Sequence, residues 1–414
     1  MVTRGHLHIL LIHQAFAALD EPGGTRHHEF ARFLVAQGNR VTVIASPVSY
    51  LTGISSQKRI RWAEKQIDDQ GVTIIRAYTY NGLHRSFVRR VFSFLSFMLS
   101  SFLIGLSITK VDVVWGTSPP IFQGITAWAL ARIKRARFIF EVRDLWPAFA
   151  VAVGVLRNRV IIRASEGFER FLYRHADKVI VNSPGFIEHI EARGAADIAL
   201  VPNGTDTSMF NPKSNGEDFR KAHDLNGKFV ALYAGAHGLS NDLGAFLRAA
   251  QLLENEDEIA IVLLGDGKEK AALETQAEEM SLKNVHFISS IPKDEMPEAL
   301  AAANVCVAIL KPVPLYGTVY PNKVFDYMAA GRPIVLAIDG VIRQVVEDAG
   351  AGEFVQPGDS RAIANSIRRM AADPMRARKM GFAGRAYVSV HFERRSLAQK
   401  LIEVMENIVD RPAV

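Results

Sequence analysis

The chain has 414 residues, of which 49% are hydrophobic and 22% charged, and its formal net charge is +6. This length and composition exclude a disordered chain and a single small domain, and they favour two folded α/β domains. A lone cysteine, Cys306, excludes an internal disulfide framework and favours the cytoplasm, while the absence of an arginine-rich tail or zinc-ligand spacing argues against a nucleic-acid partner.

Short apolar runs alternate with helical stretches in the first half of the chain. A helix over 26–37 follows the first run, and this βαβ rhythm predicts a parallel sheet with helices on both faces. The opening run predicts a strand, not a signal peptide, because no small-residue cleavage site follows it. The predicted strands are 8–13, 40–45, 72–77, 112–115, 137–142 and 178–182.

The segment 91–108 reads VFSFLSFMLSSFLIGLSI and carries no charge. Its apolar residues fall on every side of a helix, so they must be buried in protein or in lipid. A buried core helix, a helix inserted in a membrane surface and a true span all remain open. Residues 71–111 contain no acidic residue, which favours peripheral contact with an anionic leaflet; the basic residues there are Arg76, Arg85, Arg89, Arg90 and Lys110.

The second half repeats the βαβ rhythm. A helix over 241–253 separates its first two strands, and a helix that ends over 325–330 is stopped by Gly331 and Pro333. The turn-rich stretch 201–204 predicts the boundary between domains 1–202 and 203–389, and a charged helix follows over 394–409. The predicted strands are 229–234, 259–264, 285–288, 305–309 and 333–337.

Two motifs of the first domain carry possible chemistry. Gly23 and Gly24 precede the helix at 26–37, where glycine backbone and free helical amides suit an anionic ligand, although a plain tight turn is the alternative. Their spacing is not the dinucleotide fingerprint.

EVRDLWP at 141–147 follows a strand, at the edge where ligands bind open α/β sheets, so we expect Arg143 and Asp144 to face acceptor or sugar hydroxyls. A buried salt bridge is the alternative.

Two glycine turns follow the first two strands of the second domain. In YAGAHG, Gly235 and Gly238 would let phosphate oxygens approach backbone amides, and His237 would add a donor. In LLGDGK, Gly265 and Gly267 would let a flat base or a ribose come close. A turn with no ligand explains the second motif equally well.

The stretch YGTVYPNKVFDYMAAGRP at 316–333 is the most specific motif. Its proline suits the first turn of a helix, whose free amides would hold a diphosphate together with Lys323. Asp326 lies one turn further on and would accept hydrogen bonds from ribose hydroxyls. A surface Lys–Asp pair is the alternative. We also assign to the donor site Tyr316, Thr318 and Asn322.

Gly23-Gly24, VPNGTD, YAGAHG, LLGDGK and PNKVFDYMAAGRP occur in this order along the chain. In this order they resemble the retaining glycosyltransferases of family 4, which have the GT-B fold: two Rossmann-like parallel-sheet domains facing across a cleft. The resemblance covers essentially the whole chain, and PNKVFDYMAAGRP is its specific part. EVRDLWP and TSPP look most like the branch that builds bacterial cell-surface polysaccharides, and within it like transferases of the N-acetyl-L-fucosamine type.

The resemblance implies a UDP-sugar donor in the second domain, an acceptor in the first, retention of anomeric configuration and no obligatory metal or other cofactor. It implies that residues 390–414 cross back to the first domain. The acceptor would be a polyprenyl-diphosphate-linked or other saccharide of O-antigen, capsule or exopolysaccharide assembly, used at the inner face of the cytoplasmic membrane.

The sequence departs from the family pattern at two places. The two glutamates with seven residues between them are replaced by Thr318 and Asp326, and the Arg–Lys clamp after the glycine turn is missing, with His237 and Asn241 nearby. Lys323 must therefore carry more of the diphosphate charge, with Arg343 as a further candidate.

We therefore interpret the chain as a glycosyltransferase that works by front-face displacement. Lys323, backbone amides and His237 would stabilise the leaving diphosphate. The main alternative is a UDP-amino-sugar epimerase, which shares a two-domain α/β architecture. A periplasmic-type binding protein would need an export signal, and a nicotinamide oxidoreductase would need the missing fingerprint.

Overall fold

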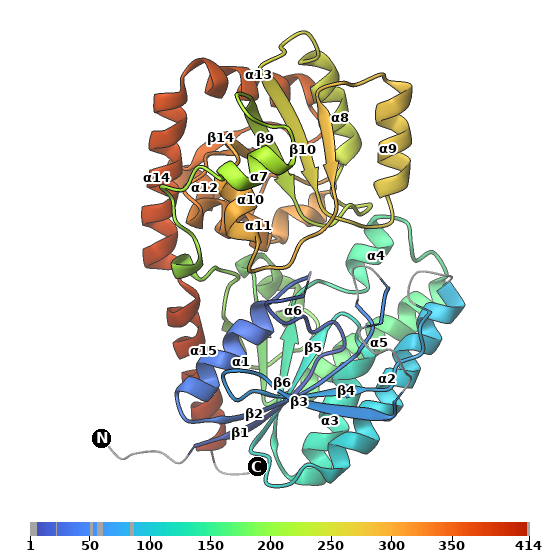
Figure 1. Cartoon of the computed structure of the whole chain (residues 1–414). Helices are drawn as coiled ribbons and strands as arrows, with labels where there is room; N and C mark the ends of the chain where they lie inside the picture. Colours follow the sequence, from blue (N-terminus) through green and yellow to red (C-terminus); the bar gives the residue numbers. More distant parts are fainter. Residues whose placement is uncertain (1–5, 22, 50–52, 56–60, 83–86, 412–414) are drawn as a thin grey trace. The chain divides into compact units, whose positions relative to one another are not determined.

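The computed structural model describes residues 6–21, 23–49, 53–55, 61–82 and 87–411, and it divides into two compact α/β units (Figure 1). The N-terminal unit comprises residues up to 19, 23–202 and 395 onward, and the C-terminal unit comprises 20–22 and 203–394. Arg85, one of the basic residues of the acid-free segment 71–111, lies outside the described residues, as does Pro22, which precedes Gly23.

The N-terminal unit is built on an eight-stranded sheet with the order β3-β4-β2-β1-β5-β6-β7-β8. All neighbouring pairs are parallel except β3 and β4, which run antiparallel at one edge. The strands are β1 (His8–Ile12), β2 (Arg40–Ala45), β3 (Ala63–Ile67), β4 (Thr73–Ala77), β5 (Val113–Ser118), β6 (Arg137–Val142), β7 (Lys178–Val181) and β8 (Ile198–Leu200).

Helices cover both faces of this sheet. On one face, α1 (Arg26–Ala36) and α15 (Arg394–Val409) share a core with the strands, in which Phe30 and Leu401 pack with Ile9. On the other face lie α2 (Phe87–Ser107), α3 (Phe122–Lys134) and α5 (Arg159–His175) (Figure 1). Gly124 of α3 allows the close approach there, because a Cβ would lie 2.6 Å from the Phe140 ring of β6.

The C-terminal unit has a six-stranded, all-parallel sheet with the order β11-β10-β9-β12-β13-β14. Its apolar residues form one core with α10, α11 and α12 on one face and another with α8, α9 and α13 on the opposite face. The strands are β9 (Phe229–Ala234), β10 (Ile259–Leu264), β11 (Val285–Ile288), β12 (Val305–Ile309), β13 (Ile334–Ala337) and β14 (Gly352–Phe354).

The helices of this unit follow the strands in βα order. Cys306 lies in β12 and is fully buried. The helices are α7 (Glu217–Ala222), α8 (Leu243–Leu252), α9 (Lys270–Glu279), α10 (Met296–Ala301), α11 (Asn322–Ala329), α12 (Val341–Asp348), α13 (Ser360–Ala372) and α14 (Pro374–His391). The remaining short helices of the chain are α4 (Ala148–Ala152), α6 (Ile187–Glu191), η1 (Pro184–Phe186), η2 (Thr207–Met209) and η3 (Pro314–Thr318).

The predicted fold class, two α/β domains with parallel sheets, is confirmed. Three short edge strands were not predicted: β3, β8 and β14. The sequence of β3 is AEKQI and four of its five residues are polar or alanine, so it lacks the apolar run that marks a buried strand.

By length and composition, the described chain holds one helix that would pass for a membrane span, Val88–Ser107 in α2, and 33% of its most apolar window is buried. A core helix or a signal sequence can meet the same criteria, so this alone is weak support for a membrane role. The prediction of an uncharged helix over 91–108 therefore holds, but the helix begins earlier and is not enclosed on all sides.

Candidate functional site

Two glycine turns lie side by side at the carboxyl ends of β9 and β10. The Gly235 amide donates to the Leu264 carbonyl and the His237 amide to the Asp266 carbonyl, both at 2.9 Å. A Cβ on Gly265 would lie 1.9 Å from the Gly235 oxygen, and one on Gly267 would lie 2.4 Å from the His237 oxygen. Glycine is therefore required at 265 and 267 by the contact between the turns, and a role in holding a base stays a prediction.

Lys323 is the second residue of α11, whose first turn faces the β9 turn. Its Nζ lies 3.8 Å from the centroid of the Tyr233 ring and would be 2.7 Å from a Cβ on Gly235. Gly235 thus leaves room for the lysine. Nζ is buried, and no described group accepts a hydrogen bond from it. Burial disfavours the charged form and lowers the pKa of Lys323 to about 7.

Tyrosine side chains fix the position of this lysine. The Tyr327 hydroxyl of α11 accepts a bond from the Ala234 amide at 2.9 Å and donates to the Ala234 carbonyl at 3.1 Å. The Tyr233 hydroxyl donates to the Ala236 carbonyl at 2.7 Å. The Tyr327 bonds tie α11 to the end of β9, and the Tyr233 bond fixes the ring that Lys323 Nζ lies over.

His237 is fully buried, and neither ring nitrogen has a hydrogen-bond partner in the described part of the chain. Burial, and next the charge of Lys270, lower its pKa to about 4. The imidazole is therefore neutral near pH 7, and its role as a donor to a phosphate stays a prediction. A neutral ring can still donate one N–H to an anion.

Asp326 does not pair with Lys323. Its carboxylate accepts bonds from Lys293 Nζ at 2.6 Å, from Thr205 Oγ1 at 2.8 Å and from Asn322 Nδ2 at 3.3 Å, and it is buried. The alternative of a surface Lys–Asp pair is thus wrong. Contact with ribose hydroxyls stays a prediction, and these hydroxyls would have to share a carboxylate that is already held by Lys293.

The remaining predicted donor residues each have a defined local environment. The Tyr316 hydroxyl contacts Ser240 Oγ, and Thr318 Oγ1 donates to the Leu315 carbonyl at 2.7 Å. Asn322 Oδ1 accepts from Arg394 at 3.3 Å. A Cβ on Gly238 would meet nothing closer than 3.7 Å, so no internal contact requires glycine there.

Three other cations near this edge face carboxylates. Lys270 lies 2.9 Å from Asp266, Lys293 lies 2.6 Å from Asp326, and Arg343 contacts Glu347 at 2.7 Å and Asp339 at 3.5 Å. Lys323 differs from all three, since its ammonium has no acceptor among the described residues. The structure therefore gives no support to Arg343 as a second free charge for a diphosphate.

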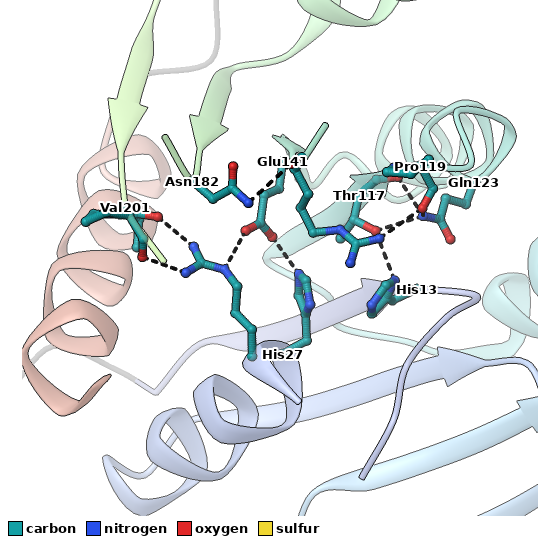
Figure 2. A network of polar contacts seen from close by, with 11 residues as sticks. His13, His27, Thr117, Pro119, Gln123, Glu141, Asn182 and Val201 are labelled. Atoms are coloured by element: carbon teal, nitrogen blue, oxygen red, sulfur yellow. Dashed lines mark hydrogen bonds and ion pairs between the residues drawn. The ribbon is translucent and has the colours of Figure 1, made fainter. Parts of the chain in front are cut away.

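In the N-terminal unit, the carboxyl edge of the sheet holds a buried ion pair (Figure 2). Glu141 accepts from Arg26 Nε at 3.0 Å and from His27 Nε2 at 2.6 Å. Arg26 also donates to the Val201 carbonyl at 2.6 Å and to the Pro202 carbonyl at 2.7 Å. Burial alone would raise the pKa of Glu141, but His27 and Arg26 lower it to about 2. The buried salt bridge considered for EVRDLWP is confirmed, with Arg26 as the partner.

A second chain of bonds fixes His13. Gln123 Oε1 accepts from the Gln14 amide at 2.6 Å, so its Nε2 points to Thr117 and donates to Thr117 Oγ1 at 2.7 Å. The Thr117 hydroxyl is then free to donate to His13 Nδ1, 3.1 Å away, which places the proton of a neutral ring on Nε2. The His13 ring contacts the His27 ring, with centroids 4.3 Å apart and the two planes tilted by 52°.

The side chains of Arg143 and Asp144 lie in different environments. Arg143 Nη2 donates to the Pro119 carbonyl at 2.9 Å, and its backbone carbonyl accepts from Asn182 Nδ2 at 3.3 Å. Asp144 is exposed. Gly23 has a φ of +149° and a Cβ there would lie 3.0 Å from the Ala17 Cβ, whereas Gly24 has open space around it. Their roles toward an acceptor stay predictions.

The sequence interpretation missed most of the N-terminal network. His13, His27 and Gln123 carry no motif, and His27 meets Glu141 across 114 residues of chain. The available signal was position, because His13 directly follows β1 and Glu141 lies near the end of β6. Among the described residues, no group of three or more His, Cys, Asp or Glu is placed to hold a metal ion.

Each of the two units matches a known protein family. Residues 23–204 match the glycosyl transferase 4-like domain, and residues 228–373 match the glycosyl transferases of group 1. The putative colanic acid biosynthesis glycosyl transferase WcaI of Escherichia coli (strain K12) is 25% identical over 354 residues, which cover 82% of this chain and 86% of that protein.

Solved structures agree with the fold. Sucrose-phosphate synthase from Thermosynechococcus elongatus has a TM-score of 0.77 at 20% identity and covers 97% of this chain and 99% of its own. Anabaena Alr3699/HepE in complex with UDP and glucose has a TM-score of 0.72 at 17% identity, with 97% and 100% covered. The chain is a glycosyltransferase with the GT-B fold, and the comparisons do not support the epimerase alternative.

Proposed function

We propose that this glycosyltransferase moves an N-acetylated amino sugar, with retention of configuration, from a UDP-sugar to a polyprenyl-diphosphate-linked saccharide. The product would be a bacterial cell-surface polysaccharide of the O-antigen, capsule or exopolysaccharide type. The observation that carries the proposal is the buried ammonium of Lys323, which has no described acceptor and lies at the first turn of α11. The likeness to a putative colanic acid biosynthesis transferase supports the pathway class.

The environment of Lys323 suits a diphosphate. A buried cation without a counter-charge is costly, and an arriving anion removes that cost. The helix start adds backbone N–H groups and the positive end of the helix dipole. Two negative phosphates bound here would raise the pKa of Lys323 and keep its proton in place. When the bond between the sugar and the diphosphate breaks, the negative charge that develops on the diphosphate would already be balanced by the Lys323 ammonium.

We assign supporting roles to neighbouring groups. His237, being neutral, would donate one N–H to a phosphate oxygen, since its ring nitrogens have no described partner. Asp326 would accept from ribose hydroxyls as an additional interaction beside Lys293. The bound UDP and UDP-glucose named for the Anabaena HepE structures support a uridine nucleotide as the donor class.

In this proposal, the acceptor saccharide binds to the N-terminal unit. Asp144 is exposed at the carboxyl edge of the sheet, and Arg143 directly precedes it. The buried ion pair of Glu141 and Arg26 holds the base of this edge in place. The enzyme would work in the cytoplasm at the inner face of the cytoplasmic membrane, where lipid-linked saccharides are assembled.

A panel of nucleotides tests the donor class through thermal stabilisation. The protein is heated with UDP, GDP, ADP, dTDP, NAD or UDP-N-acetyl sugars. A ligand present at about 100 times its Kd should raise the free energy of unfolding by about 2.7 kcal/mol. We expect UDP and UDP-amino sugars to stabilise the protein and NAD to have no effect. Stabilisation by GDP alone would contradict the uridine assignment. If none of the ligands raises the unfolding temperature, the proposed donor site itself is contradicted.

A further inference from the structure

We propose that α2 docks on an anionic membrane surface, lying parallel to it and inserting one row of apolar side chains without spanning it. This deepens the membrane contact of the proposed function by naming the surface, but it depends on no assignment of donor or acceptor. The row, called the α2 stripe, consists of Val88, Phe92, Leu95, Leu99, Leu103 and Leu106.

The α2 stripe is one continuous face of the helix. Its members are separated by three or four residues, which is the spacing of side chains stacked along one side of a helix. Their exposed fractions are 61%, 58%, 37%, 57%, 44% and 40% in chain order. The stripe is about 27 Å long, at about 1.5 Å per residue over eighteen steps. A contiguous apolar surface of this kind marks an interaction site on a soluble protein.

The opposite side of α2 is fixed to the protein, which excludes a span. Phe97, Ser100 and Ser101 are buried, and Ser100 Oγ donates to the Tyr78 carbonyl at 2.6 Å. A Cβ on Gly105 would lie 2.4 Å from Leu130 of α3, so the helices are in close contact. Crossing a bilayer would require α2 to leave this packing, whereas one-sided insertion keeps it.

Basic residues stand at both ends of the α2 stripe. Arg89 lies in the first turn, next to Val88, and is exposed. At the other end, Lys134 of α3 donates to the Ile108 carbonyl at 2.5 Å, so the end of α3 adjoins the end of α2. The exposed residues around this junction include Lys110, Arg132 and Arg135. An apolar face with cations at both ends fits an anionic lipid surface, because the stripe enters the acyl boundary while the cations meet headgroups.

Two exposed aromatic side chains with polar atoms belong to the segments that contact α2. Trp62 is 52% exposed and stacks on Tyr78, with ring centroids 6.2 Å apart. Tyr80 is 37% exposed, and its amide donates to Ser96 Oγ of α2 at 2.9 Å. Tryptophan and tyrosine suit the level of lipid headgroups, where one part of the ring is apolar and the other is hydrated.

The charges favour lipid over a second copy of this chain. An isologous contact along α2 would place the same surface of both copies together. Whether the two helices ran parallel or antiparallel, basic ends would face basic ends, since residues 71–111 contain no acidic residue. Such a contact would be opposed by repulsion between like charges. An anionic bilayer matches the apolar row and the cations at once.

Vesicle co-sedimentation of the full chain tests the proposal. We expect binding to vesicles of phosphatidylglycerol and phosphatidylcholine that weakens with salt, and little binding to pure phosphatidylcholine. The double variant Leu99→Glu/Leu103→Glu should lose on the order of tenfold in vesicle binding or more, because two charges would enter the apolar boundary. The matched control is Met375→Glu/Val390→Glu in the C-terminal unit, at side chains that are 78% and 72% exposed, and it should bind like the unchanged protein.

A fluorescent label reports insertion even if the glutamate variant folds poorly. Cys306 is fully buried, so a cysteine introduced as Leu99→Cys can be labelled selectively with an environment-sensitive dye. We expect its emission to shift to the blue on anionic vesicles, while the same dye at Val390→Cys does not shift. Equal behaviour of the two sites, or a shift that depends on protein concentration and not on lipid, would overturn the proposal. Stabilisation by UDP is measured separately, so failure here leaves the donor assignment intact.

Discussion

The carboxyl edges of the two sheets use buried charge in different ways. In the N-terminal unit, Glu141 is enclosed by Arg26 and His27, and every charge of that group has a partner. In the C-terminal unit, Lys323 is held against Tyr233 with no described acceptor for its ammonium. A satisfied buried pair maintains structure, whereas an unsatisfied buried cation is retained only if something other than folding requires it. We therefore interpret the first edge as a scaffold, and we propose that the second binds the donor.

Neighbouring lysines sharpen this contrast within the C-terminal unit itself. Lys293 and Lys270 lie close to the same strand ends, and each is paired with a carboxylate. Burial lowers the pKa of Lys323, and no negative group opposes that effect. The difference between these lysines lies in their partners, not in their residue type.

Removal of Glu141 should have the largest effect on stability. Glu141→Ala leaves Arg26 buried without its carboxylate, which should lower the free energy of unfolding by about 3–5 kcal/mol, as measured by urea denaturation. The matched control is Glu166→Ala on α5, whose 3.8 Å pair with Arg170 is partly exposed; its loss should be at most about 1 kcal/mol. Equal losses in the two variants would contradict the scaffold role of the first edge.

Asp326→Asn should have an intermediate effect, because it weakens the acceptor that Lys293 and Thr205 share. We expect a loss of about 1–3 kcal/mol in the free energy of unfolding. If Asp326 also accepts from ribose, the variant should no longer prefer UDP over 2′-deoxy-UDP in calorimetric titrations. Thr205→Val is the control, since it removes a bond to the same carboxylate but no ribose acceptor. A preference for UDP that persists in Asp326→Asn would remove the ribose role.

The pH dependence of UDP affinity should show the smallest effect. The free protein carries Lys323 with a pKa of about 7, and bound diphosphate raises it, so binding takes up a proton above pH 7. Affinity should fall by up to about tenfold per pH unit above pH 7, where the phosphates of UDP are already ionised. His237, with a pKa of about 4, stays neutral over this range. Titrations from pH 6 to 9 that show no such fall would contradict the free ammonium.

The fold, and the helix that carries the proposed donor site, were predictable from local patterns. Apolar runs located the buried strands of both sheets, and the proline before Asn322 located the start of α11. Lys323 was singled out because helix starts attract anions. These signals lie within a few residues of one another in the chain, so the sequence displays them directly.

The partners of the charged groups were not predictable in the same way. The spacing left a pair between Lys323 and Asp326 open as the alternative, but Lys293, at a distance of 33 residues, takes that carboxylate. Likewise, Gly265 and Gly267 looked like ligand contacts, and the structure shows that the turn at Gly235–His237 requires them. Such contacts depend on which strands become neighbours, and this order is set by the whole sheet.

The central claim is that Lys323 binds the donor diphosphate, and calorimetric titration with UDP tests it most directly. The unchanged protein is compared with Lys323→Met and with Lys268→Met, an exposed lysine that follows the β10 turn. Loss of a charge-assisted contact should weaken UDP binding by about 10- to 100-fold in Lys323→Met, without loss of stability, and Lys268→Met should bind normally. Unchanged UDP affinity in Lys323→Met, or an equal loss in both variants, would contradict the account.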